Sequence, residues 1–326
     1  MLIRNLSKAS LAVFALMLSG CEGGVLDPKG QVGVDEKHLI IVATLLMLIV
    51  VIPVIVMTLY FAWKYREGRD QEIYAPKWAH STTIELVVWF VPIVIVLVLG
   101  AVTWVSTQAL DPYKPLEHDA KPITVEVVSL DWKWLFIYPE QGIASVNELA
   151  FPTNVPVNFK ITSDTAMNSF FIPQLGSQIY SMAGMATKLH LIANEPGVYN
   201  GISANYSGAG FAGMKFKAIA TETPADFDAW VAKVKQQASP LNPNSYKELA
   251  KQSENNPVQY YGSVAPGMFD YIVMQYMHHD AKGMHHDAME HGNMTHGMEG
   301  QAEMDGAQHS GHSTTEHALT DKGETE

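Results

Sequence analysis

The sequence predicts a membrane protein in which a hairpin of two transmembrane helices precedes an all-β sandwich. Two almost uncharged runs, residues 39–63 and 84–108, are each long enough to cross a bilayer. Short β-like runs follow between residues 122 and 220, separated by proline, glycine and asparagine. Apolar residues at helical spacing follow in residues 222–277, and a polar tail without hydrophobic periodicity comes after them. We therefore expect amphipathic helices after the sandwich, and then a disordered tail.

The first 20 residues have the pattern of a secretory signal, because Arg4 and Lys8 precede a short apolar stretch that ends in small residues. The ending LMLSGC resembles the lipobox of bacterial lipoproteins. Residues 1–20 are therefore predicted to be removed, and Cys21 to receive a covalent lipid such as palmitate. The alternative is an uncleaved signal anchor with an incidental cysteine. Because Cys21 is the one cysteine of the chain, no internal disulfide can form.

Basic side chains favour a cytoplasmic loop between the two spans. Four lie in residues 64–80, whereas two precede the first span within residues 21–38 and two follow the second within residues 111–121. A lipidated N-terminus on the outer face requires the same orientation. We therefore expect residues 39–110 to form the hairpin, with residues 21–38 and the remainder of the chain in the periplasm of a bacterial inner membrane.

Residues 120–221 are predicted to form one β-domain. Its runs alternate with period two, as in Phe216 and Ala218 against Lys215 and Lys217, which is typical of half-buried strands. Because no helical segments separate these closely spaced strands, we expect an antiparallel sandwich.

Residues 222–277 are predicted to be a helical extension. Thr223, Pro224 and Asp226 have the pattern of an N-cap, a proline at the first helical position and a carboxylate in the first turn. A second helix is expected near Ser245, with Glu248 as its capping partner. The aromatic and apolar run 266–277 is too short to span a membrane, and we expect it to pack on the domain or on a partner.

The tail, residues 278–326, contains nine of the thirteen histidines and is rich in methionine. From residue 277 on, ten carboxylates and two lysines give −8 of the net charge of −12, so the acidity belongs to the tail. Histidine and methionine bind copper or zinc. Three roles stay open for the tail: adventitious or buffering metal binding, a solvated spacer, or a defined metal site.

Residues 201–214, GISANYSGAGFAGM, have the glycine spacing of a metal-binding loop but contain no cysteine and no histidine. Taken alone, they could also form an ordinary glycine-rich turn. The run NSFFIPQLG, residues 168–176, lies upstream of this loop in the same predicted β-domain.

A lipoprotein signal, a two-span hairpin and a periplasmic β-domain, in this order, resemble subunit II of the haem–copper respiratory oxidases. In the cytochrome c oxidases of that family, a cupredoxin fold holds a dinuclear copper centre through His-Ser-Phe/Trp and Cys-x-Glu-x-Cys-x-x-x-His-x-x-Met. The first motif falls here on Asn168-Ser169-Phe170. The second falls on Ser203, Asn205, Ser207, Phe211 and Met214.

Of the copper ligands in these motifs, only Met214 remains. Serine hydroxyls, an asparagine amide and a phenyl ring replace the soft thiolates and imidazoles that copper prefers, so no metal is expected at these positions and no electron relay in this chain. The resemblance is therefore to the cytochrome bo-type ubiquinol oxidases, whose electron donor arrives through the membrane. It implies a cupredoxin-like Greek-key sandwich, a vestigial copper site and a redox-silent subunit of a proton-pumping complex.

The same resemblance implies the partners. Haems, the active-site copper and ubiquinone are expected in subunit I, with subunit III and a small subunit IV as further partners, and cytochrome c is not expected to bind. No nucleophile–base pair, phosphate loop or basic patch stands out, so neither independent catalysis nor nucleic-acid binding is expected. The rival hypothesis is a periplasmic copper-delivery lipoprotein that uses the tail.

Three further sets of residues have two interpretations each. The resemblance places Glu85 at the entry of a proton pathway; otherwise it is a carboxylate at the membrane interface. Trp132 and Trp134 are expected on the same face of a strand, as an aromatic patch of the kind that receives electrons in copper-bearing relatives, or as core or subunit packing. His38, His80 and His190 are expected to be structural.

Overall fold

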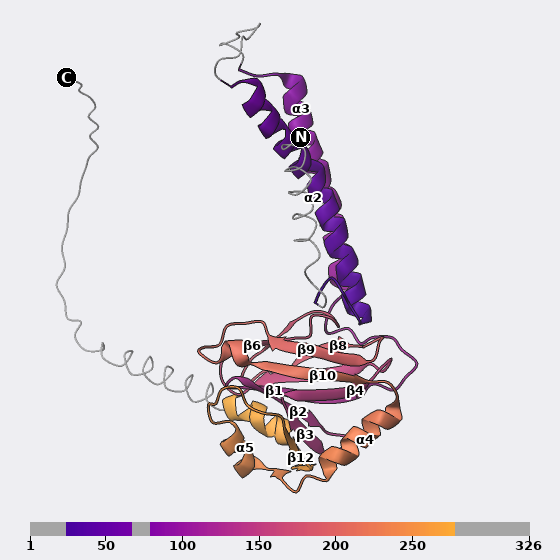
Figure 1. Ribbon diagram of the computed structural model, residues 1–326, viewed down its shortest axis with the longest axis vertical. Helices are drawn as coiled ribbons and strands as arrows, with labels where there is room; N and C mark the ends of the chain where they lie inside the picture. The colour runs from indigo at the N-terminus through magenta and orange to yellow at the C-terminus, as the bar shows by residue number, and fades with distance from the viewer. Residues whose placement is uncertain (1–23, 67–78, 278–326) are drawn as a thin grey trace, which may run out of the picture. The chain divides into compact units, whose positions relative to one another are not determined.

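The computed structural model describes residues 24–66 and 79–277 (Figure 1). Cys21, the middle of the predicted cytoplasmic loop and the tail 278–326 lie outside these residues. Signal removal, lipidation of Cys21 and metal binding by the tail therefore stay predictions.

Two long helices contain the predicted spans. They are α2 (Gln31–Lys64) and α3 (Thr82–Ala109), and both are long and apolar enough to cross a membrane. Their apolar side chains are exposed on all sides, which is expected of helices that face lipid or other subunits. α2 begins eight residues before residue 39, so the helix includes residues 31–38, which the sequence had suggested as a separate segment.

Residues ahead of α2 attach to the β-domain through their backbone. Lys29 donates its N–H to the carbonyl of Gln174 (2.6 Å), and its own carbonyl accepts from the N–H of Asn194 (2.8 Å). Gly30 forms a bridge with Ala193, and a Cβ at Gly30 would lie 2.6 Å from the backbone oxygens of Leu175 and Ile192. Only glycine permits this close approach. We call residues 24–30 the N-terminal strap.

Two stacked sheets form the β-domain, which confirms the predicted sandwich (Figure 1). The six-stranded sheet has the order β12-β3-β2-β1-β5-β8, and the five-stranded sheet has the order β4-β10-β9-β6-β7. In the first sheet the strands are β1 (Ile123–Leu130), β2 (Lys133–Tyr138), β3 (Ile143–Val146), β5 (Val157–Ser163), β8 (Thr187–Leu191) and β12 (Gln259–Tyr261). In the second they are β4 (Glu148–Pro152), β6 (Asn168–Phe171), β7 (Ile179–Ser181), β9 (Gly197–Ser203) and β10 (Lys215–Thr221).

Strand pairing is mixed, which corrects the expected antiparallel sandwich. β1 pairs with β5 and β10 pairs with β4 in parallel, whereas the other pairs within the two sheets are antiparallel. The cause is a change of sheet at Asn147, the one residue between β3 and β4, which has a left-handed φ of 59°. Since the chain leaves the first sheet there, β5 returns beside β1 in the same direction.

Aromatic side chains fill the space between the sheets. Phe170 and Phe216 stack at 5.2 Å with an interplanar angle of 10°, and Trp134 meets Phe170 edge-on at 5.4 Å. Such pairs contribute about 0.5–1.5 kcal/mol each beyond the burial of their area. Gly201 makes room for this stack, because a Cβ at Gly201 would lie 2.0 Å from the ring of Phe216.

Within the C-terminal extension, the residues from 240 onward pack on the outer face of the six-stranded sheet, whereas the first helix packs against the main core. α4 (Pro224–Lys235) begins with the predicted N-cap, since Thr223 and Asp226 form a capping box. α5 (Pro243–Leu249) is capped by Asn242, with Ser245 as its partner, so the expected pairing of Ser245 with Glu248 is wrong. A final helix spans residues 268–277, and two short strands, β11 (Pro240–Leu241) and β13 (Ser263–Val264), pair in parallel.

Buried polar contacts tie this extension to the sandwich. Lys133 is fully buried, and its Nζ donates to the carbonyl of Lys251 (2.7 Å) and to Ser253 Oγ (2.6 Å). Burial lowers the pKa of Lys133. The sequence did not predict that the extension supplies β12, which completes the first sheet beside β3.

Candidate functional site at the metal-loop positions

The fold brings the two motifs of the predicted metal loop together. Asn168 opens β6, Ser203 ends β9, and these strands are neighbours in which Phe170 lies opposite Ser203. Residues 204–214 then lead through a short 3-10 turn, η1 (Phe211–Gly213), into β10. Ser203 Oγ donates to Asn168 Oδ1 at 3.0 Å, so two positions that match copper ligands bind each other.

A buried hydrogen-bond network extends from this contact. The amide of Asn168 donates to the carbonyl of Ala166 (3.1 Å) and reaches Ser129 Oγ at 3.5 Å. Ser129 Oγ lies 2.8 Å from Ser181 Oγ, which donates to the carbonyl of Thr162 (2.7 Å). Asn168, Ser129, Ser181 and Ser203 are all buried. Neutral groups that bind one another therefore surround Asn168, which stands at the histidine position of the first metal motif.

The remaining motif positions serve packing and loop structure. Asn205 donates its amide to the carbonyl of Met167 (3.0 Å), and the ring of Phe211 meets Tyr206 at 5.6 Å. Met214 is buried in the main core. The backbone carbonyl of Ser207 accepts from the indole of Trp132 at 3.1 Å.

The indole of Trp132 explains two glycines of the loop. A Cβ at Gly210 would lie 2.3 Å from the indole, and one at Gly208 would lie 3.1 Å from it. Gly208 also has a left-handed φ of 115°. At these two positions of the loop, glycine is therefore required by packing on a tryptophan.

The expectation that Trp132 and Trp134 share a strand face is wrong. Trp132 lies in the turn between β1 and β2 with a φ of 61°, whereas Trp134 belongs to β2 and is fully buried in the core. Trp132 itself is 8% exposed. The pair therefore forms no exposed patch, and both side chains serve packing.

The other predicted residues lie away from the loop. Glu85 is in the first turn of α3, where its Oε1 accepts from the N–H of Ser81 at 3.2 Å. His190 is buried, with Nδ1 2.7 Å from Asn158 Oδ1, and burial lowers the pKa of its imidazole. His38 and His80 are exposed.

The side chains at the motif positions do not fit a dinuclear copper centre. Within residues 24–66 and 79–277, no three histidine, cysteine, aspartate or glutamate side chains gather in a way that could hold a metal ion. The sequence did not predict the network residues Ser129, Ser181 and Thr162, because isolated hydroxyl residues in strands have no diagnostic spacing.

Asp164 joins this network to the extension. Its N–H donates to the carbonyl of Ser129 (2.9 Å), and its carboxyl is buried beside Tyr246 and Tyr276. Burial raises the pKa of Asp164, and the nearby hydroxyls of the two tyrosines oppose the rise.

Asp164→Asn is expected to remove part of the pH dependence of stability. A raised folded-state pKa means that the folded chain holds a proton which the unfolded chain has lost, so stability falls as pH rises from the ordinary value of 3.8 through the raised one. The variant should lack this slope. Denaturant unfolding of both proteins between about pH 4 and pH 7 measures the difference, and equal slopes would contradict it.

Comparison with known proteins identifies relatives along most of the chain. The family model "Cytochrome C oxidase subunit II, periplasmic domain" matches residues 140–221, and the model "COX Aromatic Rich Motif" matches residues 235–280. Cytochrome bo(3) ubiquinol oxidase subunit 2 of Pseudomonas aeruginosa is 65% identical over 273 residues, which are 83% of this chain and 82% of that protein. Ubiquinol oxidase subunit 2 of Acetobacter aceti is 58% identical, over 80% of this chain and 85% of that protein.

Proposed function

Because the chain belongs to the subunit 2 family of cytochrome bo(3) ubiquinol oxidases, we propose that it is the redox-silent subunit II of a proton-pumping ubiquinol oxidase. The observation that carries the proposal is the hydrogen bond between Ser203 and Asn168, with the buried network behind it. Hydroxyl and amide groups engaged in this way offer no soft donor to copper. Electrons therefore reach the oxidase from ubiquinol without passing through this chain.

Its work in the complex is structural. We propose that the β-domain covers the periplasmic face of subunit I, which holds the haems, the active-site copper and the quinol, and that subunits III and IV complete the assembly. Ubiquinol is oxidised and O₂ is reduced to water by the complex as a whole. The lipid on Cys21 adds a second anchor to the two spans in the inner membrane, and mass spectrometry of the mature N-terminus tests this modification.

Copper analysis of the separated subunit tests the proposal. A chain that ends at residue 277 removes the metal-binding capacity of the tail from the measurement. We expect it to contain no stoichiometric copper, and the complex that includes it should consume O₂ with ubiquinol but not with reduced cytochrome c. Bound copper with a mixed-valence spectrum would overturn the proposal. Loss of oxidase activity on removal of the tail would instead favour the copper-delivery hypothesis.

We also propose that Glu85 contributes a titratable carboxyl to proton uptake. Its carboxylate accepts a hydrogen bond from Ser81 at the start of α3. Removal of the whole side chain would therefore remove this helix cap together with the titratable group, and the two effects could not be told apart. Glu85→Gln keeps an oxygen acceptor for this hydrogen bond but cannot ionise, whereas Glu85→Ala removes both properties. If the carboxyl carries protons, both variants should slow proton-coupled turnover while the complex still assembles. Normal turnover of Glu85→Gln would remove the proton role.

A further inference from the structure

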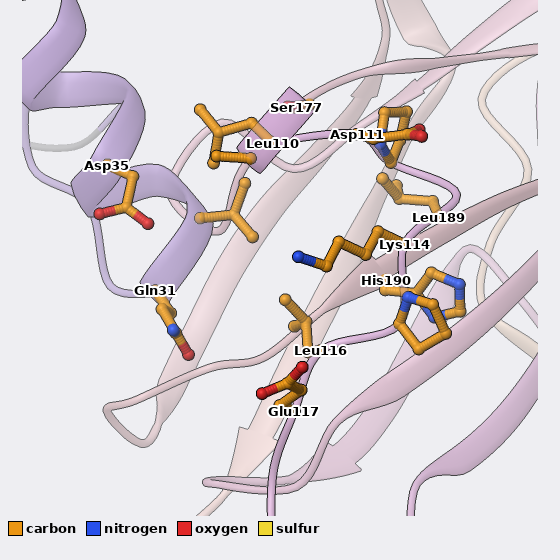
Figure 2. A pocket seen from close by; sticks show the side chains of 14 residues that line it. Gln31, Asp35, Leu110, Asp111, Lys114, Leu116, Glu117, Ser177, Leu189 and His190 are labelled. Carbon is orange, nitrogen blue, oxygen red and sulfur yellow. The ribbon is translucent and has the colours of Figure 1, made fainter. Parts of the chain in front are cut away.

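A cavity of about 350 Å³ lies where the ends of the two spanning helices meet the β-domain (Figure 2). One wall is the first turns of α2, with Gln31, Val32 and Asp35. A second wall is the end of α3 and the segment that follows it, residues 109–117. The third belongs to the β-domain and includes Ser177, Leu189 and His190.

Hydrogen bonds fix these walls. Gly33 donates its N–H to the carbonyl of Leu175 (3.1 Å), and Ser177 Oγ donates to the carboxylate of Glu36 one turn further along α2. His190 is held by Asn158 and by the backbone of Tyr113. The cavity is thus largely formed before any ligand enters, as small-molecule sites usually are.

The charged side chains of the cavity are not paired with one another. Lys114 extends into the space between Asp35 and Glu117 (Figure 2). Among the described residues, no ion pair within 4.0 Å includes any of these three side chains or Asp111. Apolar side chains line the remainder of the walls: Val32, Leu110, Pro112, Pro115, Leu116 and Leu189.

The position of the cavity along the chain places it at the level of the lipid headgroups. The uncharged run of α2 starts at residue 39, four residues after Asp35, and that of α3 ends at residue 108, three residues before Asp111. Charged side chains at these points mark the boundary between the hydrocarbon core and water. A ligand of this cavity therefore combines a polar end with an apolar one.

We propose that this cavity binds the headgroup of a phospholipid that carries an ammonium group beside its phosphate, as phosphatidylethanolamine does. Lys114 donates to the phosphate, and the carboxylates of Asp35 and Glu117 accept from the ammonium. The cavity has three acidic side chains and one lysine, which disfavours a headgroup with a net negative charge. Such headgroups bind to pockets in which basic side chains dominate. Val32, Leu110 and Leu116 contact the glycerol and the first carbons of the acyl chains.

This proposal depends on the two helices crossing the membrane, and not on the route of the electrons. The test uses the complete oxidase complex, delipidated and placed in nanodiscs that contain phosphatidylethanolamine, phosphatidylglycerol or phosphatidylcholine. Native mass spectrometry counts the lipids that each complex retains. Lys114→Met removes the phosphate donor, and Lys121→Met is the matched control, because Lys121 lies seven residues further along and does not line the cavity.

With phosphatidylethanolamine, we expect the complex with Lys114→Met to retain one lipid fewer than the complex with Lys121→Met. The affinity for this lipid should fall about tenfold, because one charge-assisted hydrogen bond is lost. Asp35→Asn should weaken retention of the same lipid. Phosphatidylglycerol should show no difference between Lys114→Met and its control. Equal retention of phosphatidylethanolamine by the two lysine variants, or a phosphatidylglycerol difference as large as that for phosphatidylethanolamine, would overturn the proposal.

Discussion

Gly201→Val is expected to lower the free energy of unfolding of the β-domain by about 3 kcal/mol or more, the upper range for an overpacked core. The new Cβ would lie 2.0 Å from the ring of Phe216, which stacks on Phe170 in the centre of the sandwich. Neither ring can move away without disturbing the other aromatic contacts of the core. Urea unfolding of the detergent-solubilised chain, followed by near-UV circular dichroism, measures the loss.

Gly197→Val is the matched control, because it adds the same side chain to the same strand, β9. A Cβ at Gly197 would meet Tyr199 at 3.6 Å, which is an ordinary contact. Valine also favours strands. The control should therefore unfold close to the natural chain, and an equal loss in both variants would show that the space beside Phe216 is not the cause.

Lys133→Met is expected to lower the free energy of unfolding by about 2 kcal/mol. Methionine keeps the apolar stem of the buried side chain but removes both hydrogen bonds that hold Lys251 and Ser253. The removal of a desolvated ammonium offsets part of this loss, because burial lowers the pKa of Lys133 and so disfavours its charged form. The C-terminal extension should therefore open locally before the sandwich unfolds.

Hydrogen exchange of residues 251–277 measures this loosening directly, beside the unfolding free energy of the whole chain. Lys215→Met is the control, since Lys215 is exposed in β10 and its replacement should change stability by no more than about 0.5 kcal/mol. Unchanged exchange in Lys133→Met would mean that the apolar contacts between the extension and the outer face of the six-stranded sheet hold the extension in place without these hydrogen bonds.

Those parts of the fold that local patterns determine were predictable from the sequence. Uncharged runs predicted α2 and α3, and Thr223 with Asp226 predicted the start of α4. The parallel pairs and β12 were not predictable, because they depend on where the chain changes sheet and on contacts between distant segments. The turn at Trp132 escaped because an apolar run with period two gives no sign of the left-handed φ that ends β1.

The candidate site divides in the same way. The resemblance to the two copper motifs implied that Asn168 and Ser203 belong to one site, and the structure joins them by a hydrogen bond. Of the partners behind them, Ser181 lies opposite Asn168 on the neighbouring strand β7, 13 residues along the chain. Ser129 lies 39 residues away in the other sheet and reaches Asn168 only through the stacking of the two sheets. Chemistry that depends on such long-range packing is visible only in three dimensions.

The N-terminal strap changes the mechanical freedom of the β-domain. A body attached to a membrane helix by one linker, here residues 110–120, can swivel about that point. The backbone bonds of Lys29 and Gly30 give it a second attachment on the other helix. Two separate attachments leave little rotation, so the domain meets neighbouring subunits already oriented and loses less rotational entropy when it docks.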